Sequence, residues 1–506
     1  MYLSPLRNIK LKLKNTETLL FRTINFTVSN LVVLVSLVGS PSVFSDTLKE
    51  EIIAKVSVAY DAKVLTSLKS ITLVDYRKNV FSKQSSPLAA PELWRFNEEL
   101  TIDFENKKKA LVSWRVNNTN KDLEKYIVNE ETGRIYDILH GKFSDDSWYN
   151  FANTGGAIER SSDTLIAKKL LLANSNFTIV NEVQYQGQPH YQVSFVLSGA
   201  TESNIYINKL SGVINKVSRM HPTLGELSYV FSNHSKVGNI TFARDMDFLV
   251  GDSPRTISTF RNIELKPDLE KKFAVPQGGT NWGKPFESSH MLYNKLGSNV
   301  YHVGKNSSRT LFIDAGEYFI SVGGNGAIKE NFASLQNYLH IKKPLKFAVL
   351  THHHRRQLNM LKPALELNAK IVTVESNLVA IKSKLGEALD ENNFVLINQF
   401  KEFLGGNLQV IDIATAHADH NLVVYLEKEK ILFAEEHYEM LFKKGNPRAF
   451  KNMLTFYNKI RGLGIDVRRL IDGSSPRVLS INEFQNTVSA YTSPHCPQGY
   501  RVCQRG

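Results

Sequence analysis

A group of imidazoles directly after an apolar segment constrains this chain more than any other feature. Residues 347–350 (FAVL) have the composition of a buried strand, and residues 351–357 continue with the sequence THHHRRQ. In extended backbone, side chains two residues apart point to the same face, so His352 and His354 are expected to face one ligand. The stretch predicts several nitrogen donors at the edge of a sheet, an arrangement that suits a metal ion.

The residues around this stretch alternate strands with helices. The expected strands are residues 300–303, 310–314, 318–322, 347–350, 371–375, 408–413, 422–425 and 431–434. The expected helices are residues 326–339, 358–367, 378–385 and 452–463. Strands and helices joined by short links predict a layered α/β architecture with its sheets inside.

The preceding part, residues 46–276, has mostly the alternating pattern of strands. Expected strands are residues 98–105, 110–117, 126–129, 178–185, 191–197, 204–207 and 213–220, with closing segments at 260–265 and 269–273 and one helix at 165–173. The pattern predicts a curved antiparallel sheet with one covered face. It resembles the half-barrel domains of periplasmic lipoprotein carriers, which implies a concave apolar face for a lipid or a partner. A dimerisation or packing domain is the alternative.

The amino terminus has the character of an export signal. Residues 1–45 carry five basic side chains and one acidic side chain, and the apolar run at residues 31–38 is too short to span a bilayer. Small residues ending at Ser45 follow this run. We therefore expect a cleaved signal peptide and a periplasmic protein. The alternative is an uncleaved segment that anchors the chain to the inner membrane.

The net charge of +13 gives little reason to expect a nucleic-acid partner. Residues 1–45 supply four of these thirteen charges, and the remaining basic residues are scattered instead of alternating with stacking aromatics. For an exported protein, peripheral contact with an anionic membrane surface is the more reasonable interpretation of the charge. An ordinary solvated surface is the alternative.

The two cysteines of the chain, Cys496 and Cys503, both lie in the final segment. In an oxidising compartment they could close a small loop, and the alternative is that both thiols stay free. No neighbouring residues complete a ligand set around them, so a metal role is not expected. Between the two domains, residues 277–289 are rich in Gly and Pro and predict a linker, and residues 486–506 are expected to form a C-terminal tail.

Several elements in residues 290–485 together resemble the metallo-β-lactamase fold. In that family a strand ends in a His-x-His-x-Asp-His motif, a later strand pair brings a further His and an Asp, and a last His follows the final helix. Here residues 351–354 match the first half of the leading motif, and residues 416–420 (AHADH) precede a strand. Residues 431–436 (ILFAEE) match the family's Leu-Phe-x-Gly-Asp element. The resemblance implies a four-layer αββα domain.

The resemblance further implies that one of the family's two metal sites is kept. It assigns the first metal to His352, His354, His417 and Glu436. It places Arg356, Gln357 and Ser474 where the second metal would have its ligands. Three imidazoles suit zinc, and one zinc ion is therefore the expected cofactor.

Arg356 argues against a second metal ion because its guanidinium stays cationic and cannot ligate. At a separation of about 4 Å it would repel a divalent ion by several kcal/mol at an intermediate dielectric. One interpretation is that Arg356 replaces the missing cation and anchors an anionic group of the substrate. The competing interpretation is a pseudoenzyme without metal, whose histidines are remnants.

Two functional hypotheses follow. In the first, the chain is a hydrolase that uses one zinc ion at His352, His354 and His417 to cleave an ester, thioester, amide or phosphoester, with Arg356 and Glu436 as further catalytic residues. Because the family's water-orienting Asp is missing, such activity should be weak or specialised. In the second, the chain is an inactive pseudoenzyme that acts as a periplasmic lipid- or protein-binding module.

The polar residues next to these ligands have plainer interpretations. His353 is expected to face away from its neighbours as a packed or surface residue. Asp419 and His420 are expected in a solvated turn, with a supporting role for the ligands as the alternative. The sequence leaves open whether Glu435 or Glu436 faces the metal. His437 could replace a lost ligand, and Ser474 has no evident base that would make it a nucleophile.

Overall fold

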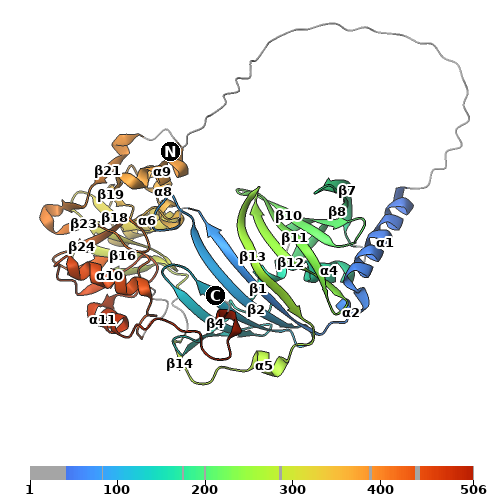
Figure 1. Ribbon diagram of the computed structural model, residues 1–506. Coiled ribbons are helices and arrows are strands. Elements are labelled where there is room, and N and C mark those ends of the chain that lie inside the picture. Colours follow the sequence, from blue (N-terminus) through green and yellow to red (C-terminus); the bar gives the residue numbers. More distant parts are fainter. Residues whose placement is uncertain are drawn as a thin grey trace, which may run out of the picture. The chain divides into compact units, whose positions relative to one another are not determined.

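The computed structural model describes residues 41–82, 84–173, 176–198, 201–283, 288–386, 390–438 and 445–504 (Figure 1). The chain divides into two units, Met1–Asp46 and Thr47–Gly506. Most of the expected export segment, residues 1–40, lies outside the described residues. Among the helices that are described, none is long and apolar enough to cross a membrane.

The first part of the larger unit is built on one sheet of 14 strands. The order across the sheet is β14-β6-β5-β4-β3-β2-β1-β13-β12-β11-β10-β9-β8-β7, and the neighbours are antiparallel except β14, which runs parallel to β6. The strands are β1 (Ser70–Phe81), β2 (Glu92–Asp103), β3 (Lys108–Val116), β4 (Lys121–Val128), β5 (Gly133–Asp137), β6 (Lys142–Asp146), β7 (Thr178–Tyr185), β8 (Gln188–Ser198), β9 (Thr201–Asn208), β10 (Ile214–His221), β11 (Gly225–Val237), β12 (Ile240–Val250), β13 (Ser253–Glu264) and β14 (Thr280–Asn281).

One apolar face of this sheet is covered by the chain's own helices. Leu73 of β1 pairs with Leu100 of β2, and both side chains belong to a buried cluster that includes Tyr60 and Leu165 from the helices. These helices are α1 (Pro41–Tyr60), α2 (Ala62–Thr66), α3 (Gly156–Arg160) and α4 (Asp163–Leu172). Each fully buried Leu contributes about 1.5–3 kcal/mol. The apolar face that the sequence assigned to a lipid or a partner therefore packs against these helices (Figure 1).

The second part of the larger unit contains two further sheets. The first has seven strands in the order β15 (Leu292–Lys295), β16 (Val300–Lys305), β17 (Ser308–Asp314), β18 (Phe319–Gly323), β19 (Leu345–Val349), β20 (Lys370–Val374) and β21 (Phe394–Ile397). The second has six strands in the order β22 (Phe400–Phe403), β23 (Leu408–Ile413), β24 (Asn421–Leu426), β25 (Ile431–Phe433), β26 (Arg469–Ile471) and β27 (Leu479–Ser480).

Three buried clusters show how these sheets pack. Val322 and Val349 of the seven-stranded sheet share one cluster with Val424 and Phe433 of the six-stranded sheet, so the two sheets face each other. A second cluster joins the other side of the seven-stranded sheet to α6 (Ile328–Leu339), α8 (Leu361–Glu366) and α9 (Leu378–Leu385). A third joins the six-stranded sheet to α10 (Lys451–Gly462) and α11 (Ile481–Ser489).

Several expected elements differ from those observed. The helix expected at residues 358–367 is divided into α7 (Arg355–Leu358) and α8. Pro363 lacks an N–H and suits the first turn of a helix, which favours a new start at Leu361. The closing segment at 269–273 is a helix, α5 (Leu269–Phe273), because Asp268 caps it by accepting from the Lys271 N–H.

The expected linker and tail both contact the large sheet. Within residues 277–289, β14 extends the sheet beside β6, while residues 284–287 lie outside the described part. Within residues 486–506, Cys496 and Cys503 form a disulfide bond, so the interpretation with free thiols is wrong. Val502 packs on the face opposite the helices, beside Trp114, and its carbonyl accepts from Asn97 at 2.7 Å.

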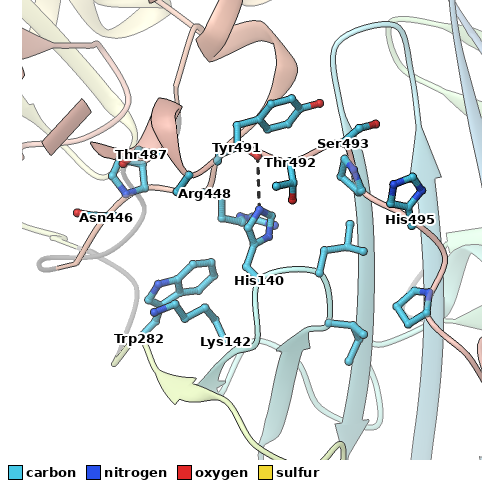
Figure 2. Close-up of a pocket in the computed structure, with 17 residues that line it drawn as sticks. His140, Lys142, Trp282, Asn446, Arg448, Thr487, Tyr491, Thr492, Ser493 and His495 are labelled. Carbon is cyan, nitrogen blue, oxygen red and sulfur yellow. Dashed lines mark hydrogen bonds between the residues drawn. The ribbon is translucent and has the colours of Figure 1, made fainter. Parts of the chain in front are cut away.

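A cavity of about 490 Å³ lies where the turn between β5 and β6 meets residues 446–449 and the tail (Figure 2). Arg448 lies in its wall, and its guanidinium is 3.1 Å from Glu124 and 3.7 Å from both Asp122 and Asp137. His140 in the same wall contacts the Ala449 carbonyl. These contacts join the large sheet to the α/β part, at a place that contains none of the predicted metal ligands.

Candidate metal centre

The predicted ligands lie on three segments that adjoin strands of the two facing sheets. Residues 350–354 follow β19, residues 414–420 connect β23 to β24, and residues 434–438 follow β25. The Leu422 N–H donates to the Thr351 carbonyl at 2.7 Å, which ties the first two segments together at the top of the sheets. These links bring residues that are far apart in sequence to one place.

The structure brings together the four side chains that the sequence assigned to one metal. One ligand atom from each of His352, His354, His417 and Glu436 lies within 4.8 Å of the others. The Nε2 atoms of His352 and His417 are 3.1 Å apart. Glu436 Oε2 lies 3.0 Å from His417 Nε2, 3.3 Å from His352 Nε2 and 3.7 Å from His354 Nδ1. This group of side chains could hold a metal ion.

The electrostatics of the group suit metal ligation. Burial lowers the pKa of His352 to about 3, and burial also lowers the pKa of His354. Both imidazoles are therefore neutral near pH 7 and keep a lone pair for a cation, which metal binding requires. Three nitrogen donors with one carboxylate oxygen form a donor set that zinc accepts. The residues present therefore fit the metal that the sequence predicted.

The backbone at Glu436 determines which of the two adjacent glutamates reaches the histidines. Glu436 has a φ of 62°, a left-handed conformation that costs a non-glycine residue about 1–3 kcal/mol. Glu435 points into the interior, where a side chain at Gly323 or Gly473 would collide with its carboxyl group. Burial raises the pKa of Glu435 to about 8. The structure thus resolves the register in favour of Glu436.

The second oxygen of Glu436 faces the residues that replace the second metal's ligands. Arg356 Nη1 lies 3.8 Å from Glu436 Oε1, and Gln357 Nε2 lies 3.5 Å from the same oxygen. Arg356 also donates to the Ser307 carbonyl, which holds the guanidinium in place. Ser474 Oγ instead donates to Asp472 at 2.9 Å. Burial acts to raise the pKa of Glu436, but hydrogen bonds from the three histidines hold this pKa well below its usual value.

Comparison with known proteins found similarity to solved structures. No protein-family model matches the sequence, and no curated protein matches it. Among solved structures, the chain is similar to the metallo-β-lactamase from Hirschia baltica at 19% identity, over 39% of this chain and 96% of that chain, with a TM-score of 0.32. It is similar to the metallo-β-lactamase from Pontibacter korlensis at 18% identity, over 40% of this chain and 98% of that chain, with a TM-score of 0.32. It is also similar to the metallo-β-lactamase FIM-1 from Pseudomonas aeruginosa in its mono-zinc form, at 15% identity, over 40% of this chain and 95% of that chain, with a TM-score of 0.31.

The similarity to each of these structures covers about two-fifths of this chain and nearly the whole of the other chain. The four predicted metal ligands, together with Arg356, Gln357 and Ser474, lie in the α/β part of this chain.

The other polar residues near the candidate metal centre have structural partners. His353 is buried and contacts the Ser85 carbonyl at 2.9 Å through Nε2. His420 Nδ1 lies 2.6 Å from Asp412. His437 stacks on Phe456 with ring centroids 4.3 Å apart, and its two ring nitrogens contact Asn421 and Asn452. His437 is thus engaged in packing and does not replace a ligand.

One contribution to this centre had no signal in the sequence. Ser85 and Ser86 come from the turn between β1 and β2, yet they contact the segments that carry the histidines.

A second buried pair, apart from the predicted ligands, was also missed. His302 and Arg309 are both fully buried on β16 and β17. Burial, with Arg309 adding to the effect, lowers the pKa of His302 to about 3.

Proposed function

We propose that this chain is an exported hydrolase with one zinc ion, which cleaves an ester, amide or phosphoester bond in a substrate that carries an anionic group. The zinc is held by His352, His354, His417 and Glu436. The observation that carries the proposal is the convergence of these four ligand atoms within 4.8 Å. The proposal includes a four-layer αββα arrangement for residues 290–485, preceded by an antiparallel β domain at residues 46–276.

When bound, zinc supplies a Lewis acid that polarises the scissile carbonyl or phosphoryl group and makes water more acidic. The protein's own residues prepare that chemistry. The buried imidazoles of His352 and His354 stay neutral and keep their lone pairs, and the carboxylate of Glu436 is the anionic ligand of the set. Gln357 and Arg356 both lie against Glu436 Oε1, which leaves Oε2 directed at the histidines. The carboxylate is therefore oriented before any substrate arrives.

Arg356 supports both the single ion and an anionic substrate. Its guanidinium lies 3.8 Å from Glu436 Oε1, so a second divalent ion beside that oxygen would face a repulsion of several kcal/mol. The side chain is 37% exposed, which leaves part of the guanidinium accessible at the edge of the centre. A carboxylate or phosphate of the substrate would pair with that accessible part.

Export is supported by the disulfide between Cys496 and Cys503, because such bonds persist in oxidising compartments. The test is amino-terminal analysis of the mature protein after expression in a Gram-negative host. A new amino terminus near residue 46 in the periplasmic fraction is expected. An intact amino terminus in the membrane fraction would instead identify an uncleaved anchor.

The function is tested by metal analysis of the purified protein together with a zinc titration of the stripped protein. One equivalent of zinc is expected, with hydrolysis of at least one class among anionic nitrophenyl esters, phosphodiesters and β-lactam amides. A His420→Ala variant is the matched control, because His420 lies beside His417 but contacts Asp412. A protein that binds no zinc would overturn the proposal.

The binding-module alternative has one observation in its favour. Glu436 Oε2 lies 3.0 Å from His417 Nε2 and 3.3 Å from His352 Nε2, so hydrogen bonds alone can satisfy this cluster. A protein without bound metal and without hydrolytic activity would support that alternative. The covered apolar face of the large sheet argues against its lipid-carrying form.

A further inference from the structure

A short turn of the large β sheet contacts both segments that carry the histidines. Residues 84–91 lead into β2, and Ser85 and Ser86 within them belong to the part of the chain that precedes the metal-binding segments by more than 260 positions. We propose that this turn is a positioning element of the metal centre, with Ser86 as its main positioning residue. The inference rests on the proposed zinc site and adds the part of the protein that sets its geometry.

The first contact falls between two ligands. His353 lies between His352 and His354 in sequence, and its Nε2 contacts the Ser85 carbonyl at 2.9 Å in a buried environment. Ser85 fixes the turn itself, since its hydroxyl lies within hydrogen-bond reach of the carbonyls of Pro87 and Ala90 and can donate to either. Because the peptide units of His352 and His354 adjoin the held residue, this contact restrains both ligands at once.

The second set of contacts flanks the third ligand. Ser86 Oγ lies 2.6 Å from Asp419 Oδ1 and 3.1 Å from the Thr415 carbonyl, so its proton can go to either acceptor. The Ser86 carbonyl accepts from the Asp419 N–H at 3.1 Å. Thr415 and Asp419 stand two positions before and after His417. Ser86 therefore holds the segment on both sides of the imidazole.

Other contacts make the turn stiff enough to act in this way. Leu88 packs against the buried cluster between the seven-stranded sheet and its helices. Thr415 Oγ1 accepts from the N–H groups of His417 and Ala418, which fixes the backbone of the ligand to the residue that Ser86 contacts. The turn thus connects a buried apolar anchor to the backbone on which His417 stands.

A metal ion binds tightly only where its ligands are already held close to their final geometry. Residues that hydrogen-bond to the ligands commonly change the metal affinity by about 10–100-fold when they are substituted. The two histidine segments come from different sheets, and a slip between them would separate His352 from His417. Contacts from one turn to both segments suppress that slip. We therefore expect the β1–β2 turn to raise zinc affinity without supplying any ligand.

The experiment compares Ser86→Ala with wild type and with Ser82→Ala. Ser82 lies before the same turn, is exposed and accepts from Arg255, so it is the matched control. We expect Ser86→Ala to weaken zinc affinity about tenfold in competition with a chromogenic chelator, and to alter the visible bands of the cobalt-substituted protein. Ser82→Ala should match wild type, and Ser86→Thr should restore both properties because it keeps the hydroxyl.

Hydrogen exchange of the metal-free proteins makes the outcome independent of the proposed function. The Asp419 amide donates to the backbone carbonyl of residue 86, which Ser86→Ala keeps. The variant loses the hydroxyl contacts to Asp419 Oδ1 and the Thr415 carbonyl, so this segment should open more often and the Asp419 amide should exchange about tenfold faster than in wild type or Ser82→Ala. Unchanged zinc affinity and unchanged Asp419 exchange in Ser86→Ala would overturn the inference. If wild type binds no zinc, the proposed function fails, and the exchange data still decide whether the turn positions His417.

Discussion

His302 and His352 are buried to the same extent, yet they stand in very different surroundings. Both side chains are inaccessible to solvent, and burial lowers the pKa of each to about 3. His302 lies on β16 beside the guanidinium of Arg309, in the interior of the sheets. His352 lies after β19, with His417 Nε2 at 3.1 Å and Glu436 Oε2 at 3.3 Å.

The difference teaches what makes a buried imidazole a metal ligand. Burial keeps both rings neutral, so a low pKa alone does not distinguish a binding site from a packed core. Convergence of other donors does distinguish it, and only His352 has such donors around its nitrogen. A cation next to His302 would be repelled by Arg309, whereas a cation next to His352 would meet a carboxylate.

The strongest test of this comparison removes ligands from the converging group. In a His352→Ala/His354→Ala double variant we expect zinc affinity to fall by at least about 1000-fold, because a structural zinc site gains roughly 10–16 kcal/mol from about four ligands. Isothermal titration or chelator competition measures the change. His302→Gln should bind zinc as wild type does. Equal losses in both proteins would end the distinction between the two histidines.

The carboxylate is the next most informative position. Glu436→Gln keeps the size of the side chain but removes the anionic ligand, so we expect zinc affinity to fall about 10–100-fold. Glu435→Gln is the matched control, since the carboxyl group of Glu435 points away from the histidines and is held between Gly323 and Gly473. A larger loss in Glu435→Gln than in Glu436→Gln would mean that the assigned register is wrong.

The pH dependence of stability tests the buried histidine of the core. The ordinary pKa of His is 6.5 and the folded value of His302 is about 3, so the unfolded state binds more protons between these values. The contribution of His302 to stability is therefore present above pH 6.5 and is lost as the pH falls towards 3. We expect the slope to reach up to about 1.4 kcal/mol per pH unit in denaturant titrations. His302→Gln should show a shallower slope, and an identical slope would contradict the assignment.

The smallest change in zinc affinity is expected for a substitution of Arg356. Because Arg356 faces Glu436 Oε1 and the histidines face Oε2, Arg356→Gln should change zinc affinity by less than about threefold. The same substitution should raise KM for anionic substrates more than for neutral substrates, with kcat affected less. A comparison of paired anionic and neutral esters measures this. A uniform change for both substrates would remove the anionic anchor from the proposed mechanism.

Much of the α/β part could be predicted from sequence because its elements follow regular apolar periods. The strand at 408–413 and the helix at 378–385 have the predicted bounds, and so does the strand at 178–185 in the large sheet. The extended backbone predicted that His352 and His354 share a face, and the resemblance to the metallo-β-lactamase pattern implied that His417 and Glu436 join them. β1 was not predicted, because Asp75 and Arg77 interrupt its apolar pattern. In the structure these two side chains form a buried ion pair at 3.0 Å.

The features of the site that could not be predicted from the sequence depend on single backbone angles and on contacts between residues far apart in the chain. The left-handed φ of Glu436 decides which glutamate faces the histidines, and nothing in two adjacent glutamates indicates that angle. Ser86 meets Asp419 across 333 positions of sequence, and its own neighbours have the composition of an ordinary polar turn. Such contacts arise only when two separately predictable parts of the chain come together.

The docked tail determines how the protein would bear mechanical load. Arg501 pairs with Glu99 at 2.7 Å, and the Val502 carbonyl accepts from Asn97, so the last described residues are fastened to β2. A pull on the carboxyl terminus would therefore enter the molecule through the large sheet. β2 begins directly after the β1–β2 turn, whose Ser85 and Ser86 contact the two histidine segments. A tether at this end would therefore transmit tension to the metal centre through that turn.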